Sequence, residues 1–258
     1  MFVQICIAIY LVLIIPILEM ISYIIYSKQI KAGTFSNRKF YFSCMLELWI
    51  PVIVLLVFVL IENNLTIQNL GLNKPIFNFN NLNTIQLILV IITVVIPILW
   101  ILLSAYQIIN INISKEYRKA YYDAVGKKLK SDETLKIKLA ILPKNIIDRI
   151  LWIGVSITAG ITEEILFRGF IVYFMSILFP ELPLWSLMLI QTIPFCLMHI
   201  YQGVNGVITT ALVGLIMAAY SYLFGSIIIA IIVHILIDLS SIFIEKEQTQ
   251  SVIEKEDD

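Results

Sequence analysis

Long apolar segments separated by polar connections constrain this chain more than any other feature of its sequence. Hydrophobic residues make up 60% of the 258 residues and charged residues only 14%. Soluble domains carry about 45–50% apolar and about 25% charged residues. A helix of about 20 apolar residues crosses a bilayer. The sequence therefore predicts an all-α fold, a polytopic membrane helix bundle. Seven spans are expected, at residues 2–26, 41–61, 85–106, 149–178, 184–200, 207–223 and 226–244.

The spans divide the chain into three regions. Residues 1–148 hold three spans and a long basic loop, residues 149–244 hold a four-span membrane domain, and residues 245–258 form a polar tail. A further half-span within 131–150 would raise the count to eight, so seven and eight spans both remain open. The first span is expected to be retained, because the first residues show neither a basic region nor a small-residue cleavage site.

The charges of the loops predict the orientation of the chain. The 27–40 loop carries four Lys and Arg residues and the 107–149 loop carries ten, whereas the 62–84 loop carries one. Basic loops stay on the cytosolic side of a membrane. We therefore expect a multi-pass protein of the cell membrane with its N-terminus outside and its C-terminus in the cytosol. The lipid bilayer is therefore an expected partner. The basic residues cluster in the loops, which argues against a nucleic-acid partner.

Two adjacent glutamates and an arginine interrupt the apolar run of the fourth span. Each ionisable group at membrane depth costs at least ~2.5–3.5 kcal/mol, which makes such groups candidates for function. Glu164 and Arg168 are four residues apart and can form an ion pair on one helix face. Glu163 is rotated about 100° from Glu164. One carboxylate can thus be neutralised by Arg168 while the other is left for chemistry. A purely structural ion pair that locks two helices together is an equally weighted interpretation of this stretch.

Only two histidines exist in the chain, and both lie in apolar spans. His199 shares a helix face with Phe195, and His234 shares one with Asp238, because the members of each pair are four residues apart. Counted along their helices at 1.5 Å per residue, these groups and Glu163 fall within one layer of the membrane. The sequence predicts a polar cavity there that opens towards the cytosol.

Carboxylate and imidazole groups in one cavity support the attack of water on a carbonyl. A carboxylate beside a histidine can take a proton from water, and a second histidine can donate to the developing oxyanion. No cofactor is needed for this chemistry. Two histidines and a carboxylate can also hold zinc with one open position. The zinc-protease spacing His-Glu-x-x-His is absent, so we favour metal-independent catalysis and keep zinc as the lesser alternative.

Three motifs in order resemble those of the CAAX protease and bacteriocin-processing family, which includes the Ras-converting CAAX endopeptidase. They are Glu163-Glu164-x-x-x-Arg168, Phe195-x-x-x-His199 and His234-x-x-x-Asp238. The resemblance covers about residues 149–244 and implies a CAAX-type intramembrane protease with a catalytic domain in that region. Residues 1–148 carry no motif that we assign.

The resemblance also implies roles for the motif residues. Glu163 activates water together with His199, and His234 and the residue at position 238 stabilise the oxyanion. Glu164, Arg168 and Phe195 support the site. Eukaryotic members carry Asn at the last position, where this chain has Asp238. An ionised Asp cannot donate to an oxyanion, so Asp238 is either protonated or orients His234.

The expected substrate is a peptide or a membrane-protein segment. Bacterial members of the family are linked to bacteriocin immunity and peptide-pheromone maturation, and the high Ile, Asn and Lys content is typical of AT-rich bacterial genomes. Two other classes compete with an endopeptidase: a non-catalytic immunity or regulatory scaffold, and a proton-coupled transporter. Glu19 and Glu47 of the first two spans suit a proton relay, although we favour carboxylates with local partners.

Overall fold

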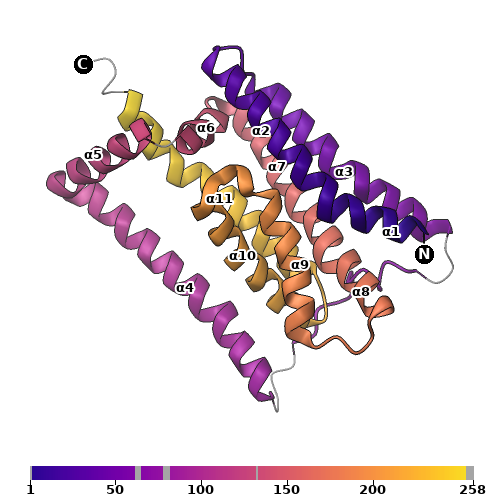
Figure 1. Cartoon of the computed structure of the whole chain (residues 1–258). Helices are drawn as coiled ribbons and strands as arrows, with labels where there is room; N and C mark the ends of the chain where they lie inside the picture. The colour runs from indigo at the N-terminus through magenta and orange to yellow at the C-terminus, as the bar shows by residue number, and fades with distance from the viewer. Residues whose placement is uncertain (1, 62–64, 78–81, 132, 254–258) are drawn as a thin grey trace.

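The computed structural model describes residues 2–61, 65–77, 82–131 and 133–253, and its regular secondary structure in these ranges is entirely helical. Five helical segments of 25 to 33 residues are long and apolar enough to cross a membrane, and two shorter apolar helices accompany them. Together they coincide with the seven predicted spans. The polytopic helix bundle expected from the sequence is thereby confirmed (Figure 1).

The first three spans extend beyond the ranges predicted from the sequence. The first runs through α1 (Phe2–Ile9), a π-helical turn η1 (Tyr10–Ile14) and α2 (Ile15–Lys31). The next two are α3 (Asn37–Ile61) and α4 (Thr84–Ile113). Because α2 continues to Lys31 and α3 begins at Asn37, the polar loop expected at 27–40 is shorter than predicted.

Asn83 begins α4 with a capping box. Its side chain accepts from the Gln86 N–H, and the Gln86 side chain accepts from the Asn83 N–H.

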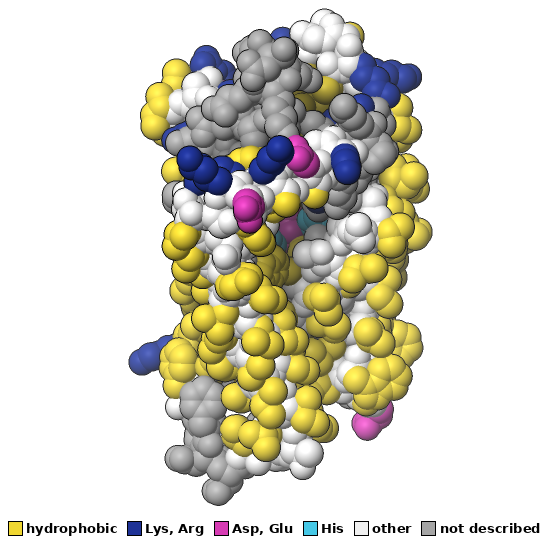
Figure 2. All heavy atoms as spheres, turned by 90° about the vertical axis from the view of Figure 1, so that its left-hand side faces the viewer, with side chains coloured by type: hydrophobic (Ala, Val, Ile, Leu, Met, Phe, Trp, Pro, Cys, Tyr) yellow, Lys and Arg dark blue, Asp and Glu magenta, His cyan; other side chains and the backbone are white. Residues whose placement is uncertain are grey.

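The long basic loop contains two helices rather than an eighth span. α5 covers Lys115–Ser131 and α6 covers Glu133–Ile141. Nine residues of helix reach only about 14 Å, far less than the ~30 Å hydrocarbon core of a bilayer. α5 and α6 lie at the same end of the bundle as the turn between α2 and α3 (Figure 1). Lys and Arg side chains gather at this basic end, and apolar side chains cover the surface beyond it (Figure 2).

The C-terminal spans carry the motifs. The fourth is continuous through α7 (Ile146–Glu163), a π-helical segment η2 (Glu164–Ile171) and α8 (Val172–Leu178). α9 (Leu184–Met198) is followed by one 3-10 turn η3 (Ile200–Gln202), α10 (Gly203–Phe224) and α11 (Ile228–Ile253). The helix α11 thus continues past the boundary expected at residue 244 into the tail.

Part of the Asn-rich connection between the second and third spans packs into the bundle instead of forming a simple outer loop. Leu70 is fully buried and belongs to the main apolar cluster with Phe167 and Phe170 of η2. The carbonyl of Gly71 accepts from the Ile227 N–H at 2.9 Å, and the N–H of Ile76 donates to the Phe224 carbonyl at 3.0 Å. Gly71 has a φ of 75°, a conformation that favours glycine. The described segment 65–77 therefore covers the end of the bundle opposite to the basic end.

Gly160 allows α7 and α11 to approach closely. A Cβ atom at this position would lie 2.5 Å from Ile235 Cγ1 and 3.3 Å from the Ile231 carbonyl. These two residues flank His234 on α11, and residue 163 follows Gly160 after one turn of α7. The packing of these helices at Gly160 therefore sets the distance between two motifs.

We expect Gly160→Ala to lower the free energy of unfolding by about 1–3 kcal/mol, the typical cost of overpacking. Thermal unfolding of the purified protein in detergent measures the effect. Gly126→Ala in α5 is the matched control, because no atom lies within 4 Å of its added Cβ. An alanine there should stabilise the helix by about 0.5–1 kcal/mol. Equal stabilities of the two variants would contradict this packing argument.

Candidate active site

The two adjacent glutamates lie at a change of helix type. Glu163 is the last residue of α7 and Glu164 is the first of η2, and all eight residues of η2 are buried. A π-helical segment widens the helix locally and occurs frequently at functional sites. The motif spacing alone indicated a regular α-helix, and no feature of the sequence that we recognised predicted this change.

Glu164 and Arg168 form the ion pair that the sequence predicts. Arg168 Nη1 lies 3.1 Å from Glu164 Oε1, and both side chains have no exposed surface. Arg168 Nη2 also donates to the Gly214 carbonyl at 3.1 Å. The guanidinium lies 4.3 Å above the centroid of the Phe195 ring. Gly214 leaves room for this contact, because a Cβ there would lie 3.3 Å from Arg168 Nη2. The pair thus connects η2 to α9 and α10.

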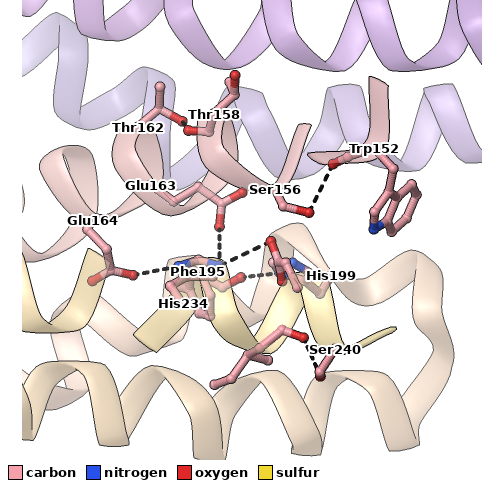
Figure 3. Close-up of polar contacts among 12 residues, drawn as sticks. Trp152, Ser156, Thr158, Thr162, Glu163, Glu164, Phe195, His199, His234 and Ser240 are labelled. Carbon is pink, nitrogen blue, oxygen red and sulfur yellow. Dashed lines mark hydrogen bonds and ion pairs between the residues drawn. The ribbon is translucent and has the colours of Figure 1, made fainter. Parts of the chain in front are cut away.

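His234 is held by the same glutamate. Its Nδ1 lies 2.8 Å from Glu164 Oε1, so one carboxylate oxygen accepts from both Arg168 and His234. The other ring nitrogen, Nε2, lies 3.8 Å from Glu163 Oε2 and 3.8 Å from Asp238 Oδ2. These two distances exceed hydrogen-bond range. Glu164 therefore orients His234 so that Nε2 faces the other two carboxyl groups (Figure 3).

His199 follows the end of α9 and is oriented by a backbone carbonyl. Its Nδ1 lies 2.9 Å from the Phe195 carbonyl oxygen. A carbonyl only accepts, so Nδ1 carries the proton, and Nε2 of the neutral ring is an acceptor. The Phe195 ring centroid lies 5.1 Å from that of His199 and 6.0 Å from that of His234. Phe195 therefore contacts both imidazoles, as the motif predicts for a supporting residue.

One cavity of about 570 Å³ reaches four of the predicted residues: Glu163, His199, His234 and Asp238 all line it. Glu164 and Arg168 lie behind the wall and do not line it. Lys138 and Leu142, from α6 and the residue after it, are also on the wall, so the cavity extends towards the basic end. Figure 2 shows a hollow below the basic side chains in which a histidine and an acidic side chain are visible.

Among the described residues, Glu163 and Glu164 each have one buried carboxylate oxygen without a hydrogen bond, but of the two only Glu163 lines the cavity. Its side chain is 8% exposed. Within the described part of the chain, its Oε2 is buried and makes no hydrogen bond. Among the described residues, no group of three or more His, Cys, Asp and Glu side chains is arranged to hold a metal. Ser240 Oγ and Cys196 Sγ donate to the carbonyls of the local helix, at 2.6 Å and 3.2 Å.

Sequence reasoning placed the motif residues together but missed other parts of the cavity wall. Tyr201 stacks on His199 with 6.1 Å between ring centroids, and Tyr23 contacts Tyr201 from α2 at 6.4 Å. Glu19 and Glu47 line this cavity as well. Carboxyl groups are rare in apolar spans, so the sequence does single out these two glutamates. Nothing in the sequence shows which cavity they face.

The fold and these contacts define a polytopic helical membrane protein with a buried carboxylate–histidine site inside the bundle. Comparison with known families identifies it further. Residues 145–240 match the family model described as type II CAAX prenyl endopeptidase Rce1-like. This match supports a relation of that region to the CAAX protease and bacteriocin-processing family, which the three motifs indicated. Comparisons with curated proteins and with solved structures gave no match.

We expect Arg168→Met to lower the free energy of unfolding by about 3–5 kcal/mol, because it leaves the Glu164 charge buried without its cation. The double variant Glu164→Gln/Arg168→Met should regain part of this loss. Unfolding in detergent measures both effects.

The matched control is Arg38→Met. Arg38 pairs with Asp148 at 3.5 Å, and the Arg38 side chain is 54% exposed. Asp148 is buried but keeps hydrogen bonds from the Lys144 N–H and Asn145 Nδ2 when Arg38 is replaced, so the loss should be at most about 1 kcal/mol. Similar losses for Arg38→Met and Arg168→Met would contradict the central position of the buried pair.

Proposed function

We propose that this protein is a glutamate-type intramembrane endopeptidase that cleaves a peptide or membrane-protein segment by attack of water. Its relation to a CAAX-type family supports an intramembrane protease in general. The observation that carries the specific proposal is the position of Glu163. This carboxyl group lines a cavity with both histidines of the chain, whereas its neighbour Glu164 lies behind the cavity wall and is paired with Arg168.

Glu163 and His199 activate water in this proposal. The Glu163 carboxylate accepts a hydrogen bond from a water molecule in the cavity and removes its proton as the water oxygen attacks the carbonyl carbon. His199 Nε2 is the acceptor nitrogen of its ring, because Nδ1 donates to Phe195. This nitrogen accepts a hydrogen bond from the second hydrogen of the same water, and so turns a lone pair of the water oxygen towards the carbonyl carbon. The proton taken by Glu163 then passes to the leaving amine.

His234 stabilises the negative charge that develops on the carbonyl oxygen. Glu164 accepts from Nδ1, so Nε2 is the atom that reaches the cavity. As an imidazolium, His234 donates from Nε2 to the oxyanion. Asp238 Oδ2, at 3.8 Å from Nε2, faces the same nitrogen. Of the two roles open to Asp238, we therefore favour support of the His234 charge over direct donation to the oxyanion.

The biological setting proposed here is bacteriocin immunity or maturation of a peptide pheromone. The substrate then is a peptide or a membrane-associated segment and not a prenylated protein. Two alternatives make different predictions. A non-catalytic scaffold keeps its cellular phenotype when Glu163 and His234 are both replaced by Ala. A proton-coupled transporter is favoured by Glu19 and Glu47 on the same cavity wall, and it moves protons in proteoliposomes.

The principal test compares wild-type protein and Glu163→Gln on a library of membrane-anchored fluorogenic peptides in detergent. We expect Glu163→Gln to lower kcat by about 10²–10⁴-fold, because general base catalysis contributes a factor of this size. His199→Gln should also lower kcat. Cleavage is followed by fluorescence and the products by mass spectrometry.

Glu181→Gln is the matched control, because Glu181 is exposed and lies far along the chain from every cavity-lining motif. It should cleave like the wild-type protein. Equal rates for Glu163→Gln and the wild type would reject the assignment. A parallel reaction with 1,10-phenanthroline tests the zinc alternative, since a zinc enzyme loses activity when its metal is removed.

We also propose that the N-terminus lies outside the cell and the C-terminus in the cytosol. The gathering of Lys and Arg at the basic end supports this orientation. Single cysteines introduced at Lys74 and at Lys119 should be labelled by a membrane-impermeant maleimide in intact cells only at position 74. The three native cysteines are replaced first. Labelling only at position 119 would reverse the orientation.

A further inference from the structure

Two carboxyl groups from the N-terminal spans lie on the wall of the proposed active-site cavity. Glu19 belongs to α2 and Glu47 to α3. Both lie outside the region 145–240 that matches the protease family. The proposed chemistry uses neither of them, so their presence at membrane depth requires another explanation.

The two groups lie at one level of the bundle. α2 and α3 are joined by a short turn, and at 1.5 Å per residue Glu19 lies about 18 Å and Glu47 about 15 Å from it. The carboxyl groups are close enough for electrostatic interaction with each other. Ser43 Oγ donates to Glu47 Oε1 at 2.6 Å. Within the described ranges, half-buried Glu19 makes neither a hydrogen bond nor an ion pair.

A row of aromatic rings connects these carboxyl groups to the proposed catalytic residues. Tyr23 follows Glu19 by one helical turn, and its ring lies 6.4 Å from that of Tyr201. The Tyr201 ring lies 6.1 Å from the His199 ring at an interplanar angle of 25°. These rings thus lie along the cavity wall between Glu19 and His199.

The charges on the cavity wall select a cation. Carboxyl groups come from Glu19, Glu47, Glu163 and Asp238, and the positive charges are the Lys138 ammonium group and the proposed His234 imidazolium, so carboxyl groups are in excess. These groups line one cavity of about 570 Å³, which has room for a substrate side chain. A positively charged group can relieve the repulsion between Glu19 and Glu47, and long Lys and Arg side chains carry such a group on an apolar stem.

We propose that Glu19 and Glu47 form a subsite that binds a lysine or arginine side chain of the peptide substrate. The inference rests on the proposed endopeptidase function and adds a substrate class to it. Tyr23 and Tyr201 pack against the apolar stem of that side chain, while the carboxylates bind its cationic end. This contact fixes the position of the peptide, so the bond to be cleaved lies beside Glu163.

The test uses sets of three membrane-anchored peptides that differ only at one position, which holds lysine, uncharged norleucine or glutamate. This position is moved along the residues near the cleaved bond. At one of these positions the wild-type protein should cleave the lysine peptide with about tenfold higher kcat/KM than the norleucine peptide, mainly through KM. Glu19→Gln should remove this preference, Glu19→Lys should reverse it in favour of glutamate, and Glu181→Gln should leave it unchanged.

A binding measurement separates this inference from the proposed function. Glu163→Gln protein should bind the lysine peptide about tenfold more tightly than the norleucine peptide, and Glu163→Gln/Glu19→Gln should bind both equally. Cleavage without any preference for lysine at any position would overturn the subsite and leave the endopeptidase standing. Equal cleavage by wild type and Glu163→Gln would reject the catalytic assignment, whereas selective binding would still support the subsite.

Discussion

The buried pair of Glu164 and Arg168 is the interaction on which the site depends. Isolated charges inside a membrane protein are costly, and this pair is fully enclosed. It is stabilised by what surrounds it: Arg168 donates to the Gly214 carbonyl and lies over Phe195, and Glu164 accepts from His234. The pair thereby joins η2, α9, α10 and α11. One glutamate is committed to this network, and its neighbour Glu163 is the one that lines the cavity.

The two histidines differ in what orients them, and this difference divides the proposed chemistry. His199 is oriented by a neutral carbonyl, which leaves an acceptor nitrogen for water. His234 is oriented by a carboxylate and faces two more carboxyl groups, an arrangement that suits a positively charged donor. Adjacent glutamates and a pair of similar imidazoles thus take distinct roles through their partners. Phe195 contacts both rings.

Apolar periodicity and the spacing of ionisable groups predicted the helical bundle, the ion pair of Glu164 with Arg168, and a shared cavity for Glu163, His199, His234 and Asp238. These features follow from local rules, since four-residue spacing and the cost of lipid-exposed charge apply in any bundle. The π-helical segment η2, the burial of Leu70 and the contact of Tyr23 with Tyr201 depend on tertiary packing. No local pattern specifies which surfaces meet, so the sequence left them open.

The packed segment 65–77 has a consequence for the membrane itself. Hydrolysis inside a bilayer needs water at the level of Glu163, and a channel that let this water through would also dissipate ion gradients. The cavity wall includes α6 at the basic end but no residue of 65–77. Leu70 and Gly71 instead pack against η2 and the turn before α11. In the proposed function, water therefore reaches Glu163 from the basic end, and the packing of segment 65–77 at the opposite end helps the bilayer to keep its electrical insulation.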